Sequence, residues 1–367
     1  MGKIFLNTLA AVQIDNQIWF SAWNINGLFK LDIISKDIEF VHRFQNLAAN
    51  AKCAHRGNVI YEKGEMFFFP FFSKKIVIYN IFTKVELEID IPDCKSEIFA
   101  AVGAIQVNRK IVFWGDESLY FYELDMETRA IKVLPYEEWV LEILNQKCSR
   151  KEWCKDRFII TFDDWNYFIE IRNGSAELKK YPSNVKCGKR PYFLKDRNGY
   201  WLCMRDTWTV FYWEENQIIA DEYEIDEDTV NCLGTYENFF VISPDIYLLA
   251  RANNRIYKVN KEKKMMEVCY DYSNLINIIH MGLGEVTPFL ITFCIDENVV
   301  FFPRGADKLL FYNLENKNAK VFPFSIDARK MFGENGWGVE ENIPVEGDVD
   351  LTFYLEMLKK GEREKRN

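Results

Sequence analysis

The sequence is poor in residues that break or loosen a chain. Its 367 residues include only 18 glycines and 10 prolines, less than the roughly 12% that these residues share in average proteins, which excludes a collagen-like or low-complexity chain. Hydrophobic residues make up 49% of the sequence, so disorder over most of the length is excluded as well. No apolar run approaches the roughly 18 residues that span a membrane, and we expect no membrane partner.

Cysteine pairs and histidine clusters are also missing. The nine cysteines include no Cys-x-x-Cys pair, which favours reduced thiols over a disulfide framework. Only three histidines are present, so a zinc site would need ligands from distant segments, and we expect no metal or cofactor. The first residues lack the apolar stretch and cleavage site of a secretory signal. These features predict a cytoplasmic protein.

An excess of positive charge is absent too. Lysine and arginine number 46 against 55 acidic residues, for a net charge of −9. Nucleic-acid binders usually show a basic balance or a basic stripe, so no nucleic-acid partner is expected. The Gly-x-Ser-x-Gly elbow, the phosphate loop and the dinucleotide fingerprint do not occur, which disfavours three large classes of enzyme.

Aromatic residues and repetition are what the sequence has in abundance. Phenylalanine, tyrosine and tryptophan make up 16% of it, which favours strands. A unit of four strand-like runs recurs, and its second run opens at positions 18, 66, 111, 158, 200, 246 and 299. This period of about 47 residues, with polar turns between the runs, is typical of propeller blades.

Residues 101–125 resemble the strand pattern of a Kelch repeat, and the likeness to β-propellers extends over about residues 8–324. The Gly-Gly signature of Kelch repeats is reduced to Gly115. The resemblance implies an all-β fold: a seven-bladed β-propeller of four-stranded antiparallel blades over residues 1–324. The segment 3–6 offers a strand that would join the last blade to the first.

Two segments interrupt the period. Residues 136–156 predict a short helical insertion before the fourth blade. Residues 325–367 form a C-terminal extension, in which Leu351, Tyr354, Leu355 and Leu358 lie on one face of a helix expected at about 349–360. That helix either packs on the propeller or docks onto a partner.

The repeat register also indicates where a ligand would bind. In propellers, the loops that leave the second strands gather at one mouth of the central channel, and a concave mouth is the default ligand site. The residue five positions after the first residue of each second run lies where that strand is expected to end. The series runs from aromatic to acidic to basic: Trp23, Phe71, Asp116, Asp163, Arg205, Arg251 and Arg304.

Arginine forks match carboxylates and phosphates, and aromatic faces stack on sugars and apolar groups. The arginine arc therefore predicts a site for an anionic ligand. Neighbouring loops add further candidate ligand-binding residues: Trp165, Trp208, His55, Arg56 and Arg190. The alternative is that the arginines and aspartates pair with one another as a structural network.

Three functions remain open. The first is a non-enzymatic propeller that binds an anionic small molecule, a peptide or a protein segment at its mouth. The second is a propeller enzyme, a hydrolase or lyase acting on an acidic carbohydrate or similar anion, with Asp116 and Asp163 as general acid and base. The third is a scaffold that holds partners through its rim and C-terminal helix. The sequence leaves the oligomeric state open.

Overall fold

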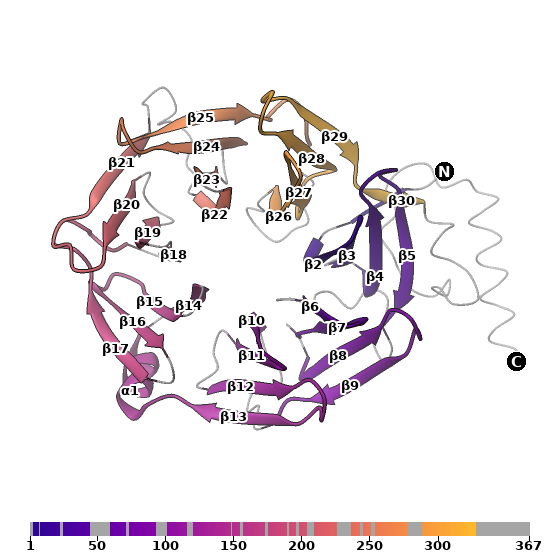
Figure 1. Ribbon diagram of the computed structural model, residues 1–367, viewed down its shortest axis with the longest axis horizontal. Helices are drawn as coiled ribbons and strands as arrows, with labels where there is room; N and C mark the ends of the chain where they lie inside the picture. The colour runs from indigo at the N-terminus through magenta and orange to yellow at the C-terminus, as the bar shows by residue number, and fades with distance from the viewer. Residues whose placement is uncertain are drawn as a thin grey trace, which may run out of the picture. The chain divides into compact units, whose positions relative to one another are not determined.

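The fold was analysed in a computed structural model of the chain. The structure describes residues 3–6, 8–22, 25–44, 59–70, 73–92, 101–115, 120–147, 149–154, 157–172, 175–188, 191–195, 198–203, 209–225, 236–242, 245–250, 254–277 and 288–327. Nearly all of these residues are in antiparallel strands or the turns between them (Figure 1). The all-β prediction is confirmed.

Four-stranded meanders are the repeating element (Figure 1). The first three sheets are β2 (Thr8–Ile14), β3 (Gln17–Ala22), β4 (Gly27–Asp32) and β5 (Ile38–Arg43); β6 (Val59–Glu62), β7 (Glu65–Phe68), β8 (Lys75–Asn80) and β9 (Glu86–Asp90); and β10 (Ala101–Val107), β11 (Lys110–Gly115), β12 (Tyr120–Asp125) and β13 (Ile131–Pro135).

Two further meanders have the same order. They are β14 (Ser149–Cys154), β15 (Arg157–Phe162), β16 (Tyr167–Arg172) and β17 (Ser175–Lys180); and β26 (Phe289–Ile295), β27 (Asn298–Pro303), β28 (Lys308–Asn313) and β29 (Ala319–Pro323).

The remaining blade-like strands form one eight-stranded sheet. It contains β18 (Tyr192–Lys195), β19 (Gly199–Cys203), β20 (Val210–Glu214), β21 (Asp221–Ile225), β22 (Tyr236–Ile242), β23 (Asp245–Ala250), β24 (Arg255–Asn260) and β25 (Met265–Asp271). Each half is a meander of four consecutive strands. The halves join where β21 pairs in parallel with β25 through Glu224–Met265 and Ile225–Met266.

Every predicted second strand is present. β3, β7, β11, β15, β19, β23 and β27 each begin one residue before the opening that the repeat predicted. The repeat succeeds because an apolar run between two polar turns is a local signal that needs no tertiary contact.

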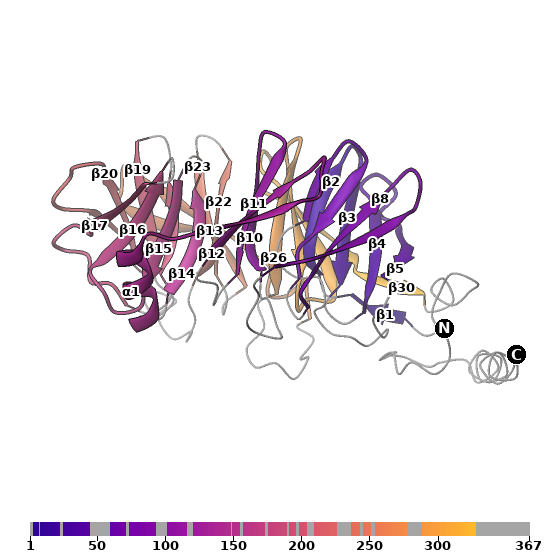
Figure 2. The ribbon, with the colours of Figure 1, turned by 90° about the horizontal axis from the view of Figure 1, so that it is seen from below.

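The only helix among the described residues is α1 (Glu138–Gln146), which lies where a helical insertion was predicted. The insertion is shorter than 136–156, because β14 occupies residues 149–154 as the first strand of its sheet. α1 lies beside β17 (Figure 2), and the Glu137 carboxylate accepts the Ala176 N–H at 2.8 Å. The described residues contain no helix that could span a membrane. The helix expected at 349–360 lies outside the described residues.

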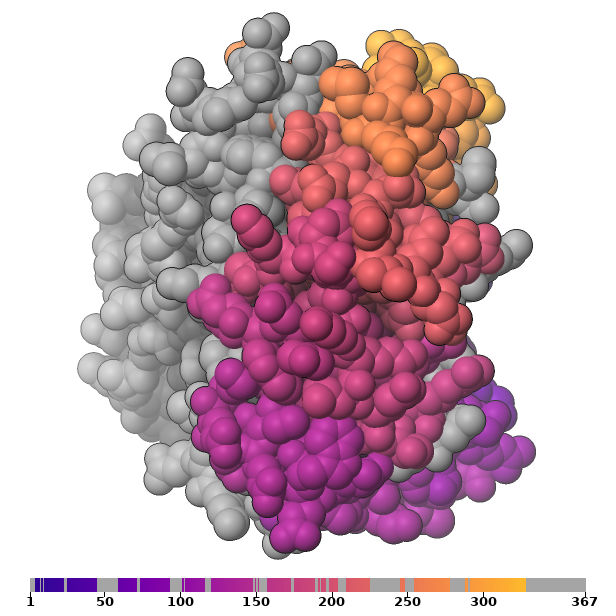
Figure 3. Space-filling model, turned by 90° about the vertical axis from the view of Figure 1, so that its left-hand side faces the viewer, coloured from indigo at the N-terminus to yellow at the C-terminus, as the bar shows by residue number. Residues whose placement is uncertain are grey.

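Contacts divide the chain into two compact units. Unit 1 comprises residues 1–111, 124–131 and 276–367, and unit 2 comprises 112–123 and 132–275. On the face seen in Figure 3, the coloured residues of unit 2 run from magenta to orange in the order of the chain.

In unit 1, an apolar seam joins sheet β2–β5 to sheet β26–β29. The Phe20 ring lies 5.5 Å from the Phe302 ring and 5.2 Å from the Phe324 ring. All three side chains are fully buried. β1 (Lys3–Phe5) pairs with β30 (Ser325–Asp327) and adds Ile4 to the same core. The N-terminal strand therefore pairs with the segment just beyond the last meander, in a two-stranded sheet of its own, whereas the sequence predicted a strand joining the last blade to the first.

Five of the turns after third strands share one construction. The strand ends in Asp or Asn, whose side-chain oxygen accepts backbone N–H groups of the turn. Four residues later a basic residue has a left-handed φ of 51–66°. The pairs are Asp32 and Lys36, Asn80 and Lys84, Asp125 and Arg129, Asn260 and Lys264, and Asn313 and Lys317. We call these residues the turn repeat.

The basic residue of the turn repeat contacts another meander in three cases. The Lys36 Nζ lies 3.9 Å from the centre of the Phe311 ring, the Arg129 guanidinium donates to both oxygens of Glu65, and Lys264 pairs with Asp221 at 2.5 Å. The turn repeat therefore caps a hairpin and, in these three cases, also fastens neighbouring meanders.

Candidate functional site

Three of the twelve predicted site residues are described. Asp163 and Trp165 lie in unit 2 on the loop between β15 and β16, and Arg304 lies in unit 1 directly after β27. The other nine lie outside the described residues: Trp23, His55, Arg56, Phe71, Asp116, Arg190, Arg205, Trp208 and Arg251. The seven-residue series is therefore described at only two of its positions, Asp163 and Arg304.

Backbone hydrogen bonds fix the loop between β15 and β16. Asp164 has a left-handed φ of 53°, and its N–H donates to the carbonyl of Gly188 at 3.0 Å. The carbonyl of Asn166 accepts the N–H of Tyr181 at 3.0 Å. Asp163 is half-buried and Asp164 is exposed. The loop therefore presents two carboxylates from a fixed backbone.

Trp165 on this loop is half-buried against the protein. Its ring lies edge-to-face to the Phe162 ring at 5.0 Å and 5.2 Å from the Tyr167 ring. The Lys147 ammonium lies 5.1 Å from the ring centre, within cation–π range. Part of the aromatic surface predicted to meet a ligand is thus already used in packing.

The thiol beside this loop is not a nucleophile. Cys187 donates weakly to the carbonyl of Phe162 at 3.6 Å. Burial raises its pKa to about 11, and the charges of Asp163 and Asp164 act in the same direction. A cysteine attacks as the thiolate, so Cys187 stays protonated and inert at neutral pH.

Arg304 begins a tightly held turn. The carbonyl of Pro288 accepts the N–H groups of Arg304, Gly305 and Ala306 at 2.9–3.2 Å. The carboxylate of Asp307 accepts two hydrogen bonds from Asn277, at 2.8 and 2.9 Å. The Arg304 side chain is half-buried. The guanidinium therefore extends from a backbone that cannot shift without breaking these bonds.

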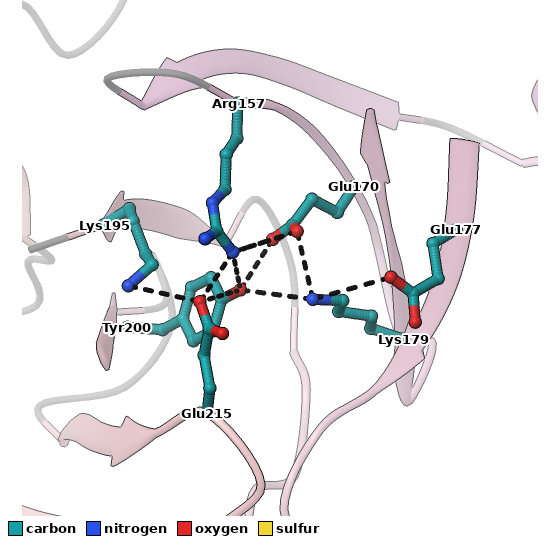
Figure 4. A network of polar contacts seen from close by, with 7 residues as sticks. All are labelled: Arg157, Glu170, Glu177, Lys179, Lys195, Tyr200 and Glu215. Atoms are coloured by element: carbon teal, nitrogen blue, oxygen red, sulfur yellow. Dashed lines mark hydrogen bonds and ion pairs between the residues drawn. The ribbon is translucent and has the colours of Figure 1, made fainter. Parts of the chain in front are cut away.

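The most extensive polar cluster of unit 2 lies at the opposite ends of the strands. It joins sheet β14–β17 to the meander β18–β21, and we call it the charged seam (Figure 4). Its members are Arg157, Glu170, Lys179, Lys195, Tyr200 and Glu215, with Glu177 at its edge. Sequence reasoning missed all of them.

Arg157 and Glu170 form the centre of the charged seam. Their side chains are only 10% and 5% exposed, and they pair at 3.0 Å. The Tyr200 hydroxyl donates to Glu170 at 2.6 Å and accepts from Arg157 at 2.9 Å. Arg157 also pairs with Glu215 at 2.6 Å. One guanidinium thus meets two carboxylates from different meanders (Figure 4).

Two lysines complete the charged seam. Lys179 pairs with Glu170 at 3.0 Å and with the exposed Glu177 at 3.7 Å. The side chain of Lys195, 4% exposed, lies 3.5 Å from Glu215. Its ammonium is also 4.8 Å from the centre of the Tyr200 ring. Buried charges need such partners because desolvation otherwise costs several kcal/mol per ion, about as much as a whole domain's margin of stability.

The environment fixes the protonation states of the charged seam. Burial opposes ionisation of Glu170, but hydrogen bonds from Tyr200 and Lys179 outweigh it and hold the pKa of Glu170 below its usual value. Burial likewise opposes ionisation of Glu215, and Arg157 and Lys195 lower its pKa overall. Burial and the hydrogen bond to Glu170 raise the pKa of Tyr200. These shifts keep Glu170 and Glu215 charged and Tyr200 protonated near pH 7, the states in which they form the ion pairs and hydrogen bonds of the charged seam.

Comparison with known proteins gives the fold. No protein-family model and no curated protein matches the sequence. Among solved structures, virginiamycin B lyase from Staphylococcus aureus is 14% identical with a TM-score of 0.57, over 83% of this chain and 95% of that one. YCF48 from Cyanidioschyzon merolae is 10% identical with a TM-score of 0.59, over 85% and 97%. The chain folds as a β-propeller.

A third similar structure contains a ligand. YCF48 bound to D1 peptide is 9% identical with a TM-score of 0.58, over 84% of this chain and 92% of that one. At such identities the likeness shows the propeller fold and its four-stranded antiparallel blades. Similar propellers thus include an enzyme and a protein with a bound peptide.

Proposed function

We propose that this propeller is a binding protein that takes an anionic small molecule, a peptide or a protein segment at the loops leaving its second strands. The observation that supports this proposal is the turn at Arg304, where three backbone N–H groups donate to the carbonyl of Pro288. A guanidinium on a fixed backbone loses little freedom on binding, which favours affinity. Its planar fork suits carboxylates and phosphates.

The peptide in the YCF48 structure supports a ligand of this kind. The inert thiol of Cys187 and the fixed protonation of the charged seam supply no activated group for catalysis. Under this proposal Arg205, Arg251 and Arg304 hold the anion. Trp23, Phe71, Trp165 and Trp208 contact its apolar part, with His55, Arg56 and Arg190 at the border.

A thermal-shift panel of inorganic anions, uronic acids and acidic peptides tests the proposal. A ligand that binds only the folded state raises the melting temperature, by an amount that grows with its concentration. Arg304→Ala should abolish the rise, whereas Arg109→Ala, at a 74% exposed arginine next to Glu127, should leave it unchanged. If no compound of the panel raises the melting temperature, anion binding is wrong.

The second candidate is an enzyme, a hydrolase or lyase acting on an acidic carbohydrate or similar anion. It would use Asp116 and Asp163 as acid and base. The half-buried position of Asp163 on a fixed loop favours it, as does the presence of a lyase among similar propellers. Loss of turnover in Asp163→Asn with the thermal shift retained would establish this function over simple binding.

We further propose seven Kelch-like blades and a cytoplasmic location. The two halves of the eight-stranded sheet support the blade count, because each is a meander of four consecutive strands and only two residue pairs join them. Counting each half as one blade, together with the five separate sheets, gives seven.

A scaffold role through the rim and the C-terminal helix becomes preferable if mutation of Arg304 spares partner binding and deletion of residues 348–367 abolishes it.

A further inference from the structure

The turn between β8 and β9 in unit 1 exposes large apolar side chains. Phe82 is 75% exposed, Val85 60% and Leu87 47%. Phe82 stands two residues after Asn80 in the turn repeat. At that position three other turns carry glutamates, namely Glu127, Glu262 and Glu315. An apolar residue therefore stands where most equivalent turns place a charge for solvent.

The Phe82 ring is held in place despite its exposure. It lies over Gly64, where a Cβ atom would come within 2.3 Å of the ring. Gly64 has a φ of 89°, and its carbonyl accepts the N–H of Ile81 at 2.8 Å. The Asn80 side chain accepts the N–H of Phe82 at 3.0 Å. An exposed aromatic group with a fixed position is a favourable anchor for binding.

Positive charge flanks this aromatic group. Lys63 precedes Gly64, Lys84 follows Phe82 by two residues, and both lysines are exposed. Lys84 is the turn-repeat equivalent of Lys36 and Arg129, which contact neighbouring meanders. Within the described part of the chain, neither Lys63 nor Lys84 makes an ion pair. The surface formed by Lys63, Phe82, Lys84 and Val85, here the basic turn surface, thus suits an acidic segment with apolar side chains.

The chain contains such a segment. Residues 337–350 carry five carboxylates, no lysine or arginine, and several apolar side chains, Trp337 and Ile343 among them. Charge complementarity therefore matches this segment to the basic turn surface.

The acidic segment is also within reach. The described chain ends at Asp327 in β30, which belongs to unit 1 and contacts β5. Trp337 lies ten positions beyond Asp327, and ten residue steps can extend about 33 Å. Following the six-residue strand β5 takes about 20 Å, and crossing to the next packed sheet takes about 10 Å.

We propose that residues 337–350 dock onto the basic turn surface of the same chain. The carboxylates of the segment pair with Lys63 and Lys84, and its apolar side chains cover Phe82 and Val85. This contact is independent of the proposed mouth site. It fastens the C-terminal extension to the outer turn of sheet β6–β9.

Hydrogen exchange of the full-length protein, followed by mass spectrometry, tests the docking. Amides of residues 337–350 should exchange at least about tenfold more slowly than in a free peptide of the same sequence, since docking closes them to solvent. Phe82→Ser and the double change Lys63→Glu/Lys84→Glu should each abolish the protection. Ile34→Ser is the matched control, because Ile34 is also 75% exposed at the equivalent position; it should leave protection intact.

Zero-length carbodiimide crosslinking supplies a second readout. Lys63 or Lys84 should join a carboxylate of 337–350 within one chain, at a yield independent of protein concentration. Free-peptide exchange rates in the wild-type protein would overturn the proposal. Protection that survives both surface variants would overturn it as well, since the segment would then dock elsewhere. Crosslinks only between chains would show a second copy as the occupant and would also overturn it.

Discussion

The apolar seam of unit 1 and the charged seam of unit 2 join the same kind of element by different physical means. In the apolar seam, Phe20, Phe302 and Phe324 interlock with ring centres 5.2–5.5 Å apart. In the charged seam, Arg157 and Glu170 take the central place. The four-stranded meander therefore does not dictate how it meets its neighbour.

The difference lies in directionality. Apolar burial contributes about 25 cal/mol per Å² whatever the angle of contact, so the apolar seam supplies stability and tolerates small shifts. Ion pairs need defined geometry, and a buried pair often stabilises no more than apolar residues of the same shape. We therefore expect the charged seam to fix the alignment of its two meanders more than it adds to their stability.

The largest effect is expected in the apolar seam. Phe302→Ala removes a fully buried ring and should lower the free energy of unfolding by about 4 kcal/mol, through lost burial and the cavity left behind. Urea denaturation measures the loss. Ile34→Ala is the control, since that side chain is 75% exposed and its truncation should change stability by less than about 0.5 kcal/mol. Equal losses would show that the apolar seam is not packed as described.

Breaking the charged seam should have the next largest effect. Glu170→Gln leaves Arg157 and Lys179 short of a counter-charge and should cost about 3 kcal/mol in the same measurement. Glu177→Gln removes a 70% exposed partner of the same lysine and should cost less than about 0.5 kcal/mol. Arg157→Met/Glu170→Leu, which removes both charges, should cost less than Glu170→Gln alone. A larger loss in the double variant would contradict the expectation that the seam contributes alignment more than stability.

Low pH should distinguish the charged seam from the apolar seam by its effect on stability. The pKa of Glu170 and that of Glu215 are lowered in the folded protein. Their stabilising contribution is therefore present above the unfolded value of about 4.5 and is lost as the pH falls through the lower folded values. Melting temperatures between pH 7 and pH 3 should fall more steeply in the wild-type protein than in Arg157→Met/Glu170→Leu. Parallel curves would show that these carboxylates are not the source of acid sensitivity.

The smallest effect concerns the edge of the apolar seam. Lys36→Ala removes the ammonium that lies 3.9 Å from the centre of the Phe311 ring and should cost about 0.5–1 kcal/mol. Lys317→Ala removes an exposed turn-repeat lysine that makes no ion pair within the described residues, and it should leave the unfolding free energy unchanged. If the two variants unfold alike, the contact between Lys36 and Phe311 contributes nothing to the apolar seam.

The strands could be predicted from the sequence because their signal is local and repeated. An apolar run such as Phe158–Phe162 between polar turns identifies its own strand. β14 was missed because its sequence, Ser-Arg-Lys-Glu-Trp-Cys, reads as polar. Its Lys151 is nevertheless buried and donates to the carbonyl of Gly115 at 3.2 Å. A lysine in an inner strand is identified only by its tertiary partner.

The charged seam could not be found by a search along the chain. Arg157 meets Glu170 after 13 residues and Tyr200 after 43, and the second contact depends on how two meanders face each other. The register search pointed to the opposite ends of the strands, where Asp163, Trp165 and Arg304 are the described predicted residues. Charged residues at strand ends are usually exposed to solvent. Only the three-dimensional arrangement therefore shows that Arg157 and Glu170 are buried.

The pairing of β1 with β30 has a consequence for the order of folding. Ile4 is synthesised before its partner Ile326, which follows roughly 320 residues later. At about 5–20 residues per second, synthesis leaves β1 without its partner for about 16–64 s. β1 is thus paired only after all the meanders described here have been synthesised. A nascent chain stalled before residue 325 should keep its N-terminus accessible to protease, however many meanders have already formed.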